Sequence, residues 1–216
     1  MSATSADFQR AVLSRCDWAC LEAGAPIQFG GEERGELIGL ARGIVELRTI
    51  LGRADTPIMH FAHPVFWFGF VPIVSSRPRP LAASAKTQVW VARIPQADLG
   101  ALLAERPEWW RHLIPPSLVY GDVAVTIAAD LLIRDSERRC AAVLLRLSGR
   151  RSAGPKDSEP VEVAVTQDEL AGAANLSLTS VRTMLSRLKA RRLIELGYRG
   201  MIVCAPAALR AFVDQG

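Results

Sequence analysis

The sequence predicts an α+β chain with three successive parts: a β-rich N-terminal part, one long helix, and a C-terminal module of short helices with a hairpin. Residues 26–95 alternate short apolar runs with Gly, Pro, Asp and Arg turns, which is typical of an all-β sandwich or barrel. Residues 117–134 keep a helical spacing of apolar side chains. Residues 166–204 contain two short helical patterns, a tight turn between them, and a hairpin pattern.

Length and composition favour a folded protein without a membrane span. The chain has 216 residues, half of them hydrophobic, with a net charge of +4 and a pI of about 9.2. This mild basicity is compatible with a nucleic-acid partner. The start "MSATSADFQR" lacks the basic and apolar segments of a signal peptide, and the apolar block 65–74 is about half of the roughly 20 residues that cross a bilayer. We therefore expect a cytoplasmic protein without disulfides.

The N-terminal part is expected to begin with a helix over 7–21, because Phe8, Val12, Cys16 and Cys20 recur every four residues. The β-rich region follows, and another helix is expected to begin near Gln96 and to stop before Pro107. The runs expected to form strands are 36–40, 44–51, 57–62, 65–74 and 87–94.

The stretch 66–85, "FWFGFVPIVSSRPRPLAASA", raises the question of a pocket. It passes from an apolar strand pattern into a segment with two arginines. Alternation along a strand would place Phe66, Phe68 and Phe70 on one side, with Trp67 and Gly69 on the other.

The central helix is expected to be buried on more than one side. One stripe contains Val119, Val123, Ile127 and Leu131, and a second adds Ala124 and Ala128. We interpret it as a dimerisation helix, and an internal core helix is the alternative. Asp135 is expected to cap the next helix, 136–147, with Glu137 in its first turn. Residues 148–160 have the composition of a linker.

The C-terminal module predicts a helix-turn-helix. Thr166 and Glu169 form a capping-box pattern, Leu170 and Ala174 make an inner face, and Ser177 can cap the second helix. That helix has an apolar face and a polar face. The apolar face comprises Val181, Met184, Leu185 and Leu188, and the polar face comprises Thr179, Ser180, Arg182, Thr183, Ser186 and Arg187.

Basic residues concentrate in this module. Between 176 and 200 there are six, Arg182, Arg187, Lys189, Arg191, Arg192 and Arg199, against the single acid Glu195. Glycines 197 and 200 suit a tight hairpin, which would form a wing beside the helices. Arginine and lysine neutralise phosphates, and short polar side chains reach base edges, so this pattern predicts double-stranded DNA as the partner. The alternative is an ordinary amphipathic helix with a charged outer face.

Most of the chain resembles the CRP/FNR superfamily of bacterial transcription regulators. The most specific match is "VTQDELAGAANLSLTSVRTMLSRLKARRLIEL", with weaker matches over 134–147 and 57–109. The resemblance implies a β-roll effector domain (double-stranded, jelly-roll-like) over 1–116, a dimerisation helix over 117–135 and a winged helix-turn-helix over 136–216. It also implies a homodimer on a palindromic site, with RNA polymerase as a further candidate partner.

The recognition helix departs from the family pattern. Familiar members carry a Glu and, four positions later, an Arg that read bases; here the matching positions are Thr179 and Thr183. Arg182, Thr179 and Thr183 are our candidates for base contact, and Arg187 and Arg199 for phosphate contact. We expect a DNA site unlike the common family consensus. The complete set expected at the DNA is Thr166, Gln167, Leu178, Thr179, Ser180, Arg182, Thr183, Arg187 and Arg199.

The effector region departs as well. Members that bind cyclic nucleotides place a Gly-Glu pair about ten residues before an Arg-Ser or Arg-Ala pair. In those members the Glu accepts a hydrogen bond from the ribose and the Arg pairs with the cyclic phosphate. Here the match is Gly69-Phe70 and then Arg79-Pro80, so phenylalanine replaces the Glu. Pro80 also lacks the backbone N–H that a phosphate-binding loop would use. In the same members the dimerisation helix carries a Thr-Ser pair that contacts the base of the nucleotide. The matching positions in this chain are Ala124 and Val125. Cyclic AMP is therefore not expected as the effector, and the expected pocket comprises Gly69, Phe70, Arg79, Ala124 and Val125.

No metal site or catalytic constellation is expected. Cys16 and Cys20 share a helical face, whereas Cys140 and Cys204 lie in other segments, so the thiols do not suggest a cluster. His60 and His63 are candidate haem ligands, with ordinary strand and turn histidines as the alternative. No cofactor is expected, and haem or another small effector is the alternative. The alternative from a different class is a sensor or ligand-binding protein of the same fold with a vestigial DNA-binding module.

Overall fold

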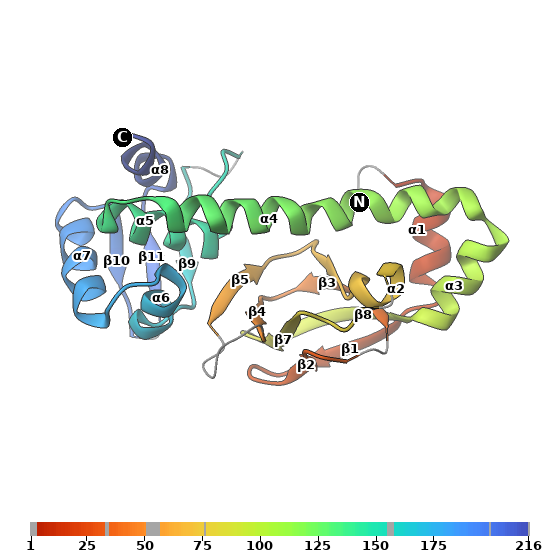
Figure 1. Ribbon diagram of the computed structural model, residues 1–216. Coiled ribbons are helices and arrows are strands. Elements are labelled where there is room, and N and C mark those ends of the chain that lie inside the picture. Colours follow the sequence, from red (N-terminus) through yellow and green to blue (C-terminus); the bar gives the residue numbers. More distant parts are fainter. Residues whose placement is uncertain are drawn as a thin grey trace. The chain divides into compact units, whose positions relative to one another are not determined.

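The computed structural model describes residues 4–32, 35–50, 57–75, 77–154, 158–198 and 200–215. These residues fall into two compact units (Figure 1). The first is made of the described parts of 1–56 and 62–124, and the second of 57–61 and of the described parts of 125–216. The long helix α4 (Ile114–Leu132) and the strand β5 (Ile58–Ala62) both run across the division.

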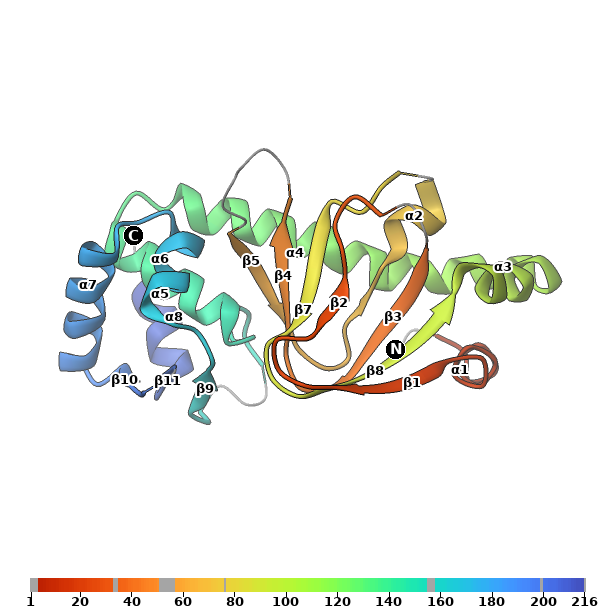
Figure 2. The ribbon, with the colours of Figure 1, turned by 90° about the horizontal axis from the view of Figure 1, so that it is seen from below.

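The first unit contains two antiparallel sheets, as the β-rich texture predicts (Figure 2). The order in one sheet is β1 (Asp17–Leu21), β8 (Val89–Pro95), β3 (Glu36–Arg42) and β6 (Trp67–Phe68). The other includes the neighbours β2 (Pro26–Gln28), β7 (Leu81–Ala85) and β4 (Val45–Thr49). The two sheets share a core of buried side chains that includes Ile38, Leu47, Phe68 and Val91.

Helices cover a second core in the same unit. They are α1 (Ala6–Leu13), α2 (Phe70–Ser75), α3 (Gln96–Glu105) and the 3-10 helix η1 (Pro107–Leu113). The bounds of α3 match the prediction, since Pro107 cannot continue the α-helix. Phe8, Leu37, Phe70, Leu99 and Trp109 meet in this core.

The predicted helix over 7–21 is wrong beyond Leu13. Phe8 and Val12 are buried on α1 as predicted, but β1 begins at Asp17 and pairs with β8. Cys20 is exposed there, opposite Trp90. A spacing of four also fits a strand, in which residues 16, 18 and 20 share one face, and the available partner strand decides between the two.

The predicted strand through Phe66–Phe70 is also wrong in part, because β6 contains only Trp67 and Phe68. Gly69 ends it with a φ of +92°, and α2 begins at Phe70. A Cβ atom at Gly69 would lie 2.1 Å from the Glu36 carbonyl oxygen, so the turn requires glycine at this position.

The described part of the second unit combines helices with a small antiparallel sheet. The helices that follow α4 are α5 (Ser136–Leu147), α6 (Gln167–Ala174), α7 (Leu178–Ala190) and α8 (Pro206–Asp214). The order in the sheet is β10 (Ile194–Leu196), β11 (Met201–Val203) and β9 (Val161–Val163). The hairpin of β10 and β11 is the predicted one. β9 and α8 were not predicted, because a three-residue strand and a short terminal helix carry little periodicity.

Local signals set the helix starts in this unit correctly. The Asp135 carboxylate accepts from the backbone N–H of Arg138 at 2.8 Å, so Asp135 caps α5 as predicted. With the antiparallel sheets of the first unit and the helices and hairpin of the second, the predicted α+β fold class is confirmed.

A buried charge network lies inside the second unit. Asp130 on α4 is fully buried and accepts from Arg146 at 3.0 Å and from Arg151 at 2.9 Å. Arg146 also donates to the Met59 carbonyl oxygen, and Arg151 pairs with Asp214 on α8 at 3.7 Å. The network joins segments that are far apart in the sequence. Among the described residues, no helix has the length and apolar character needed to span a membrane.

Candidate nucleic-acid interface and effector pocket

The first helix of the predicted pair, α6, begins at a complete capping box. The backbone N–H of Glu169 donates to Thr166 Oγ1 at 3.1 Å, and the Glu169 carboxylate accepts from the Thr166 N–H at 2.8 Å. Asn175 ends the helix in the left-handed conformation, with a φ of 51°. This conformation suits asparagine and makes the turn between the helices short.

The second helix, α7, begins with Ser177, whose Oγ accepts from the Ser180 N–H at 3.1 Å. Val181, Leu185 and Leu188 are completely buried on its inner face. The predicted fourth member, Met184, is only half-buried.

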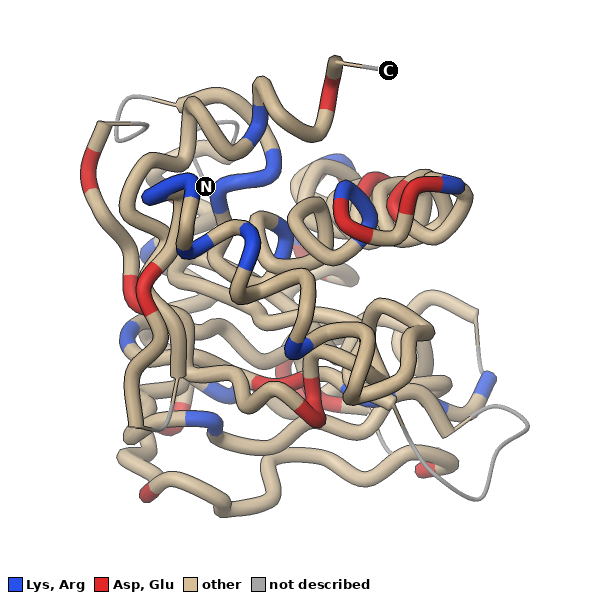
Figure 3. Tube along the Cα trace, turned by 90° about the vertical axis from the view of Figure 1, so that its left-hand side faces the viewer, with Lys and Arg blue, Asp and Glu red and all other residues tan. Residues whose placement is uncertain are grey.

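The outer face of α7 is polar, as predicted. Thr179, Arg182, Thr183, Ser186 and Arg187 are exposed there. The other predicted contacts are less uniform. Thr166 is exposed, whereas Gln167, Leu178 and Ser180 are half-buried, and the Ser180 hydroxyl is engaged by Ser177 at 2.8 Å. Figure 3 views the chain from the side on which α7 lies in Figure 1, with basic positions in blue and acidic positions in red.

One acidic residue holds two of the basic side chains. Glu137, in the first turn of α5, lies 3.5 Å from Arg187 and 3.7 Å from Arg191. Sequence reasoning assigned Glu137 only to the helix start, because no spacing rule relates it to a residue 50 positions away. Arg199 of the predicted set lies outside the described residues.

The structure brings three of the five predicted effector residues together. Gly69, Phe70 and Arg79 line one cavity of about 160 Å³ in the first unit. From α4 this cavity is lined by Ser117 and Tyr120. Ala124 and Val125 do not line it, and Val125 is 70% exposed. Tyr120 lies one helical turn before Ala124, so the cavity meets α4 earlier than the resemblance implied.

Arg79 is the charged group of this cavity. Its side chain is 4% exposed, and Nη1 donates to the Glu32 carboxylate at 2.7 Å. Nε and Nη2 are buried and have no hydrogen-bond partner among the described residues. The Oε1 atom of Gln28, which lines the same cavity, is also buried without a partner in the described part of the chain. Buried polar groups are normally satisfied, so these atoms suit a polar ligand.

Tyr120 closes the cavity on the side of α4. Burial raises the pKa of its phenol well above the ordinary value, while a hydrogen bond with the Gly69 backbone and the charge of Arg79 act in the opposite direction. The Tyr120 ring meets Phe70 edge to face, with ring centroids 6.2 Å apart. The neutral phenol of Tyr120 is therefore the group that α4 presents to Gly69, Phe70 and Arg79 in this cavity.

The remaining sequence candidates do not converge. Among the described residues, no group of three or more His, Cys, Asp or Glu is arranged to hold a metal ion. Cys140 is buried, Cys16 and Cys204 are half-buried, and Cys20 is exposed. His60 and His63 line neither this cavity nor the larger cavity of the first unit.

Comparisons with known proteins match both units. A family model described as a Crp-like helix-turn-helix domain matches residues 138–212. A second, described as a cyclic nucleotide-binding domain, matches residues 19–106. No curated protein matches the chain.

Several solved structures share the fold. One is the c-di-GMP responsive global regulator CLP of Xanthomonas campestris, with 18% identity over 92% of this chain and 99% of that chain and a TM-score of 0.71. FixK2 of Bradyrhizobium japonicum has 19% identity over 91% of this chain and 96% of that chain, with a TM-score of 0.72. A CRP-family transcriptional regulator of Thermus thermophilus has 22% identity over 90% of this chain and 96% of that chain, with a TM-score of 0.70. With both family models in the expected order, the chain belongs to the CRP/FNR superfamily of bacterial transcription regulators.

Proposed function

We propose that the chain is a cytoplasmic, homodimeric, sequence-specific transcription regulator that binds a palindromic DNA site and does not respond to cyclic AMP. The observation that carries this proposal is the outer face of α7. It exposes Arg182, Arg187 and short hydroxyl side chains, while its inner face is fixed in the core. A helix of this kind fits the major groove, with arginines near phosphates and base edges. RNA polymerase as a further partner stays a prediction.

The homodimer is supported by an apolar stripe along α4. Its positions follow a heptad spacing, and all six are exposed: Ile114, Leu118, Gly121, Val125, Ala128 and Leu132. Leu118, Val125 and Leu132 are 62%, 70% and 79% exposed and stand seven residues apart. Large apolar side chains in a heptad pattern are typical of a helix that packs on a second helix. A second copy of α4 would bury this stripe.

The size of the Arg79 cavity argues against cyclic AMP. Its volume of about 160 Å³ is close to the roughly 150 Å³ cavity that holds one benzene ring in another protein. A purine, a ribose and a phosphate together exceed this volume, so most of cyclic AMP would lie outside the cavity. Phe70 also replaces the ribose acceptor, and Pro80 offers no N–H. We propose a smaller effector with an anionic group for Arg79 and an apolar body.

DNA binding is tested by fluorescence anisotropy on fragments recovered by genome-wide mapping of binding sites. The double variant Arg182→Ala, Arg187→Ala should no longer bind specific sites. For the remaining binding, the slope of log K against log salt concentration should become shallower by about one for each phosphate contact that is lost. The matched control is Arg77→Ala, Arg111→Ala, which removes the same charge from exposed positions of the first unit. Absence of binding to every genomic fragment would favour the alternative, a sensor with a vestigial DNA-binding module.

The effector is tested by thermal unfolding with cyclic AMP and with benzoate as the probe. Benzoate should raise the Tm of the wild type because it binds only the folded state. The increase should disappear in Arg79→Gln and persist in Arg77→Gln, an exposed arginine two positions away. An increase of several degrees with cyclic AMP would show that the argument from Phe70 and cavity size is wrong.

A further inference from the structure

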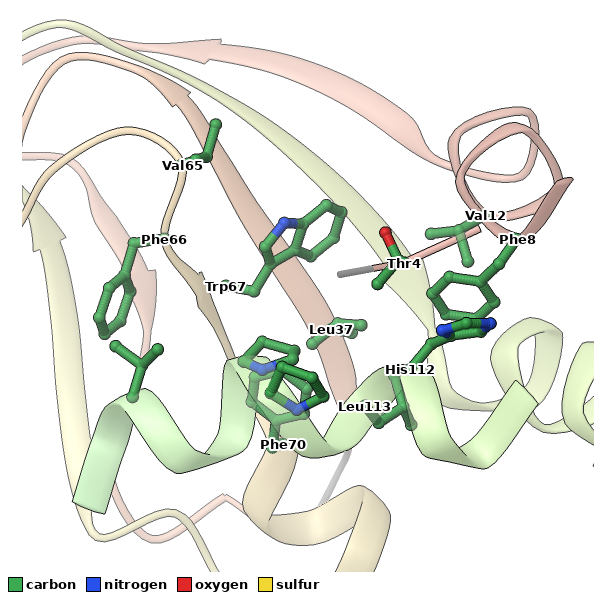
Figure 4. A pocket seen from close by; sticks show the side chains of 13 residues that line it. Thr4, Phe8, Val12, Leu37, Val65, Phe66, Trp67, Phe70, His112 and Leu113 are labelled. Carbon is green, nitrogen blue, oxygen red and sulfur yellow. The ribbon is translucent and has the colours of Figure 1, made fainter. Parts of the chain in front are cut away.

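The first unit contains a second and larger cavity, which Phe70 also lines. Its volume is about 190 Å³, and Phe70 alone among the described residues lines both cavities. Figure 4 shows the rings of Phe8, Trp67, Phe70 and His112 around this space, with Thr4 between Trp67 and Phe8. The cavity involves α1, β3, β6, η1 and the first turns of α4.

Aromatic rings form much of the wall. Phe8 and His112 stack at 4.8 Å between centroids with a tilt of 35°, and Phe66 contributes a further ring. Aromatic pairs prefer edge-to-face or offset contacts at about this range, so such walls favour another ring over an alkyl chain. None of the described residues that line this cavity is Asp, Glu, Lys or Arg. An ionic ligand would therefore lose its hydration without gaining a charged partner.

The polar groups gather at one end. Thr4 and His112 belong to the lining, and His112 Nε2 lies 3.3 Å from the Ser5 hydroxyl. The second nitrogen of the same ring can bond a ligand hydroxyl, as either donor or acceptor according to the tautomer. Apart from these two residues and the rings of Phe8, Phe66, Trp67 and Phe70, the lining side chains are aliphatic or proline.

We propose that this cavity is a binding site for a neutral, single-ring aromatic molecule with one small polar substituent, of which phenol is the simplest example. An apolar cavity of about 150 Å³ is known to hold benzene, so about 190 Å³ leaves space for a substituent of one or two heavy atoms. The site goes beyond the proposed function, because it shares no charged group with the Arg79 cavity and needs no DNA.

The test is isothermal titration of the full-length protein with phenol, supported by thermal unfolding. Wild type should bind one phenol per chain, and at about ten times the Kd the Tm should rise by about 3–6 °C. Thr4→Trp, which places an indole beside Trp67, should weaken phenol binding at least about tenfold. Val74→Trp is the matched control, because Val74 lines only the Arg79 cavity and is exposed. It should leave phenol binding unchanged.

A second variant keeps the proposal falsifiable if the indole of Thr4→Trp turns to solvent. Leu37→Phe fills the cavity from the buried face of β3, and should weaken phenol binding in a protein whose cooperative unfolding shows that it is folded. The proposal is overturned if wild type shows no saturable phenol binding. It is also overturned if both filling variants bind phenol as wild type does, or if Val74→Trp loses binding equally. Loss of benzoate binding in Arg79→Gln with phenol binding intact would separate the two sites.

Discussion

Single residues determine where the first unit places the side chains that line its cavities. Gly69 is the clearest case, because its positive φ ends β6 and starts α2 within one residue. Any side chain there would collide with the Glu36 carbonyl oxygen. The resemblance to cyclic-nucleotide sites pointed to Gly69 and Phe70. The turn itself could not be predicted, since it depends on the backbone of β3, more than thirty residues earlier.

The cysteines differ in burial, and we expect their reactivity to differ with it. Burial, with the charge of Asp17 as a smaller cause, raises the pKa of Cys16 to about 11. Burial, with Glu137 as a smaller cause, raises the pKa of Cys140 to about 12. The thiolate is the reacting form, and at pH 8 its fraction should be on the order of 10⁻³ for Cys16 and 10⁻⁴ for Cys140.

We therefore expect iodoacetamide at pH 8 to alkylate the exposed Cys20 first and Cys140 last, as read by mass spectrometry of digests. Raising the pH from 8 to 9 should increase the thiolate fraction of Cys16 and Cys140 about tenfold each, because both pKa values lie above this range. Denatured protein provides the control, in which the four rates should converge. Labelling of Cys140 as fast as Cys20 in the folded protein would contradict the burial argument.

At the scale of elements, the helices of the second unit were predicted well and β1 was not. The starts of α5, α6 and α7 are set by capping contacts within three residues, which the sequence contains in full. β1 depends on pairing with β8, some seventy residues away. A residue pattern cannot reveal such a partner, and the period of four along α1 concealed the change to a strand.

The long helix α4 was predicted as buried on more than one side, and its inner side includes Ile127 and Asp130. The heptad stripe of the proposed dimer uses a different set of positions from the predicted stripes, which mixed inward and outward residues. Ala128 is the shared member. Which side of a helix faces inward depends on the segments that it packs against. The spacing of apolar residues alone could therefore not separate the inner face of α4 from its exposed stripe.

Val125→Glu should convert the proposed dimer into a monomer. Each dimer would bury two carboxylates in an apolar seam, which should weaken association by at least about 100-fold. Light scattering coupled to size exclusion at about 10 µM measures the mass. Ala104→Glu, on the exposed face of α3, introduces the same charge as a control and should stay dimeric. A dimeric Val125→Glu would show that α4 does not form the seam.

At the scale of the whole molecule, the chain has two compact units that can be followed by separate signals. All five tryptophans belong to the first unit: Trp18, Trp67, Trp90, Trp109 and Trp110. The Asp130 network belongs to the second. Tryptophan fluorescence therefore reports the first unit, while helical circular dichroism also reports the second.

Asp130→Asn should destabilise the second unit by about 3–5 kcal/mol, because it leaves the buried Arg146 guanidinium without its carboxylate. In urea titrations, circular dichroism should show an earlier transition, while the midpoint of tryptophan fluorescence should change little. Asp122→Asn, at an exposed position of the same helix, should leave both transitions in place. Replacing both partners, as in Asp130→Leu, Arg146→Met, should cost much less than Asp130→Asn alone. Equal effects of Asp130→Asn and Asp122→Asn would rule out the network as a source of stability.

The place of Phe70 in the lining of both cavities has a consequence for how such a regulator could change its signal. Phe70 is the one described residue that lines both cavities, and each cavity is of about one-ring size. We expect Phe70→Ala to connect the two cavities, and their combined volume would fall in the range of about 300–1,000 Å³ that is typical of sites for larger ligands. The connected cavity would have Arg79 at one end and His112 at the other, suited to an aromatic molecule that carries an acid on a spacer. The single substitution Phe70→Ala would thus replace two binding sites for small ligands by one site for a larger ligand.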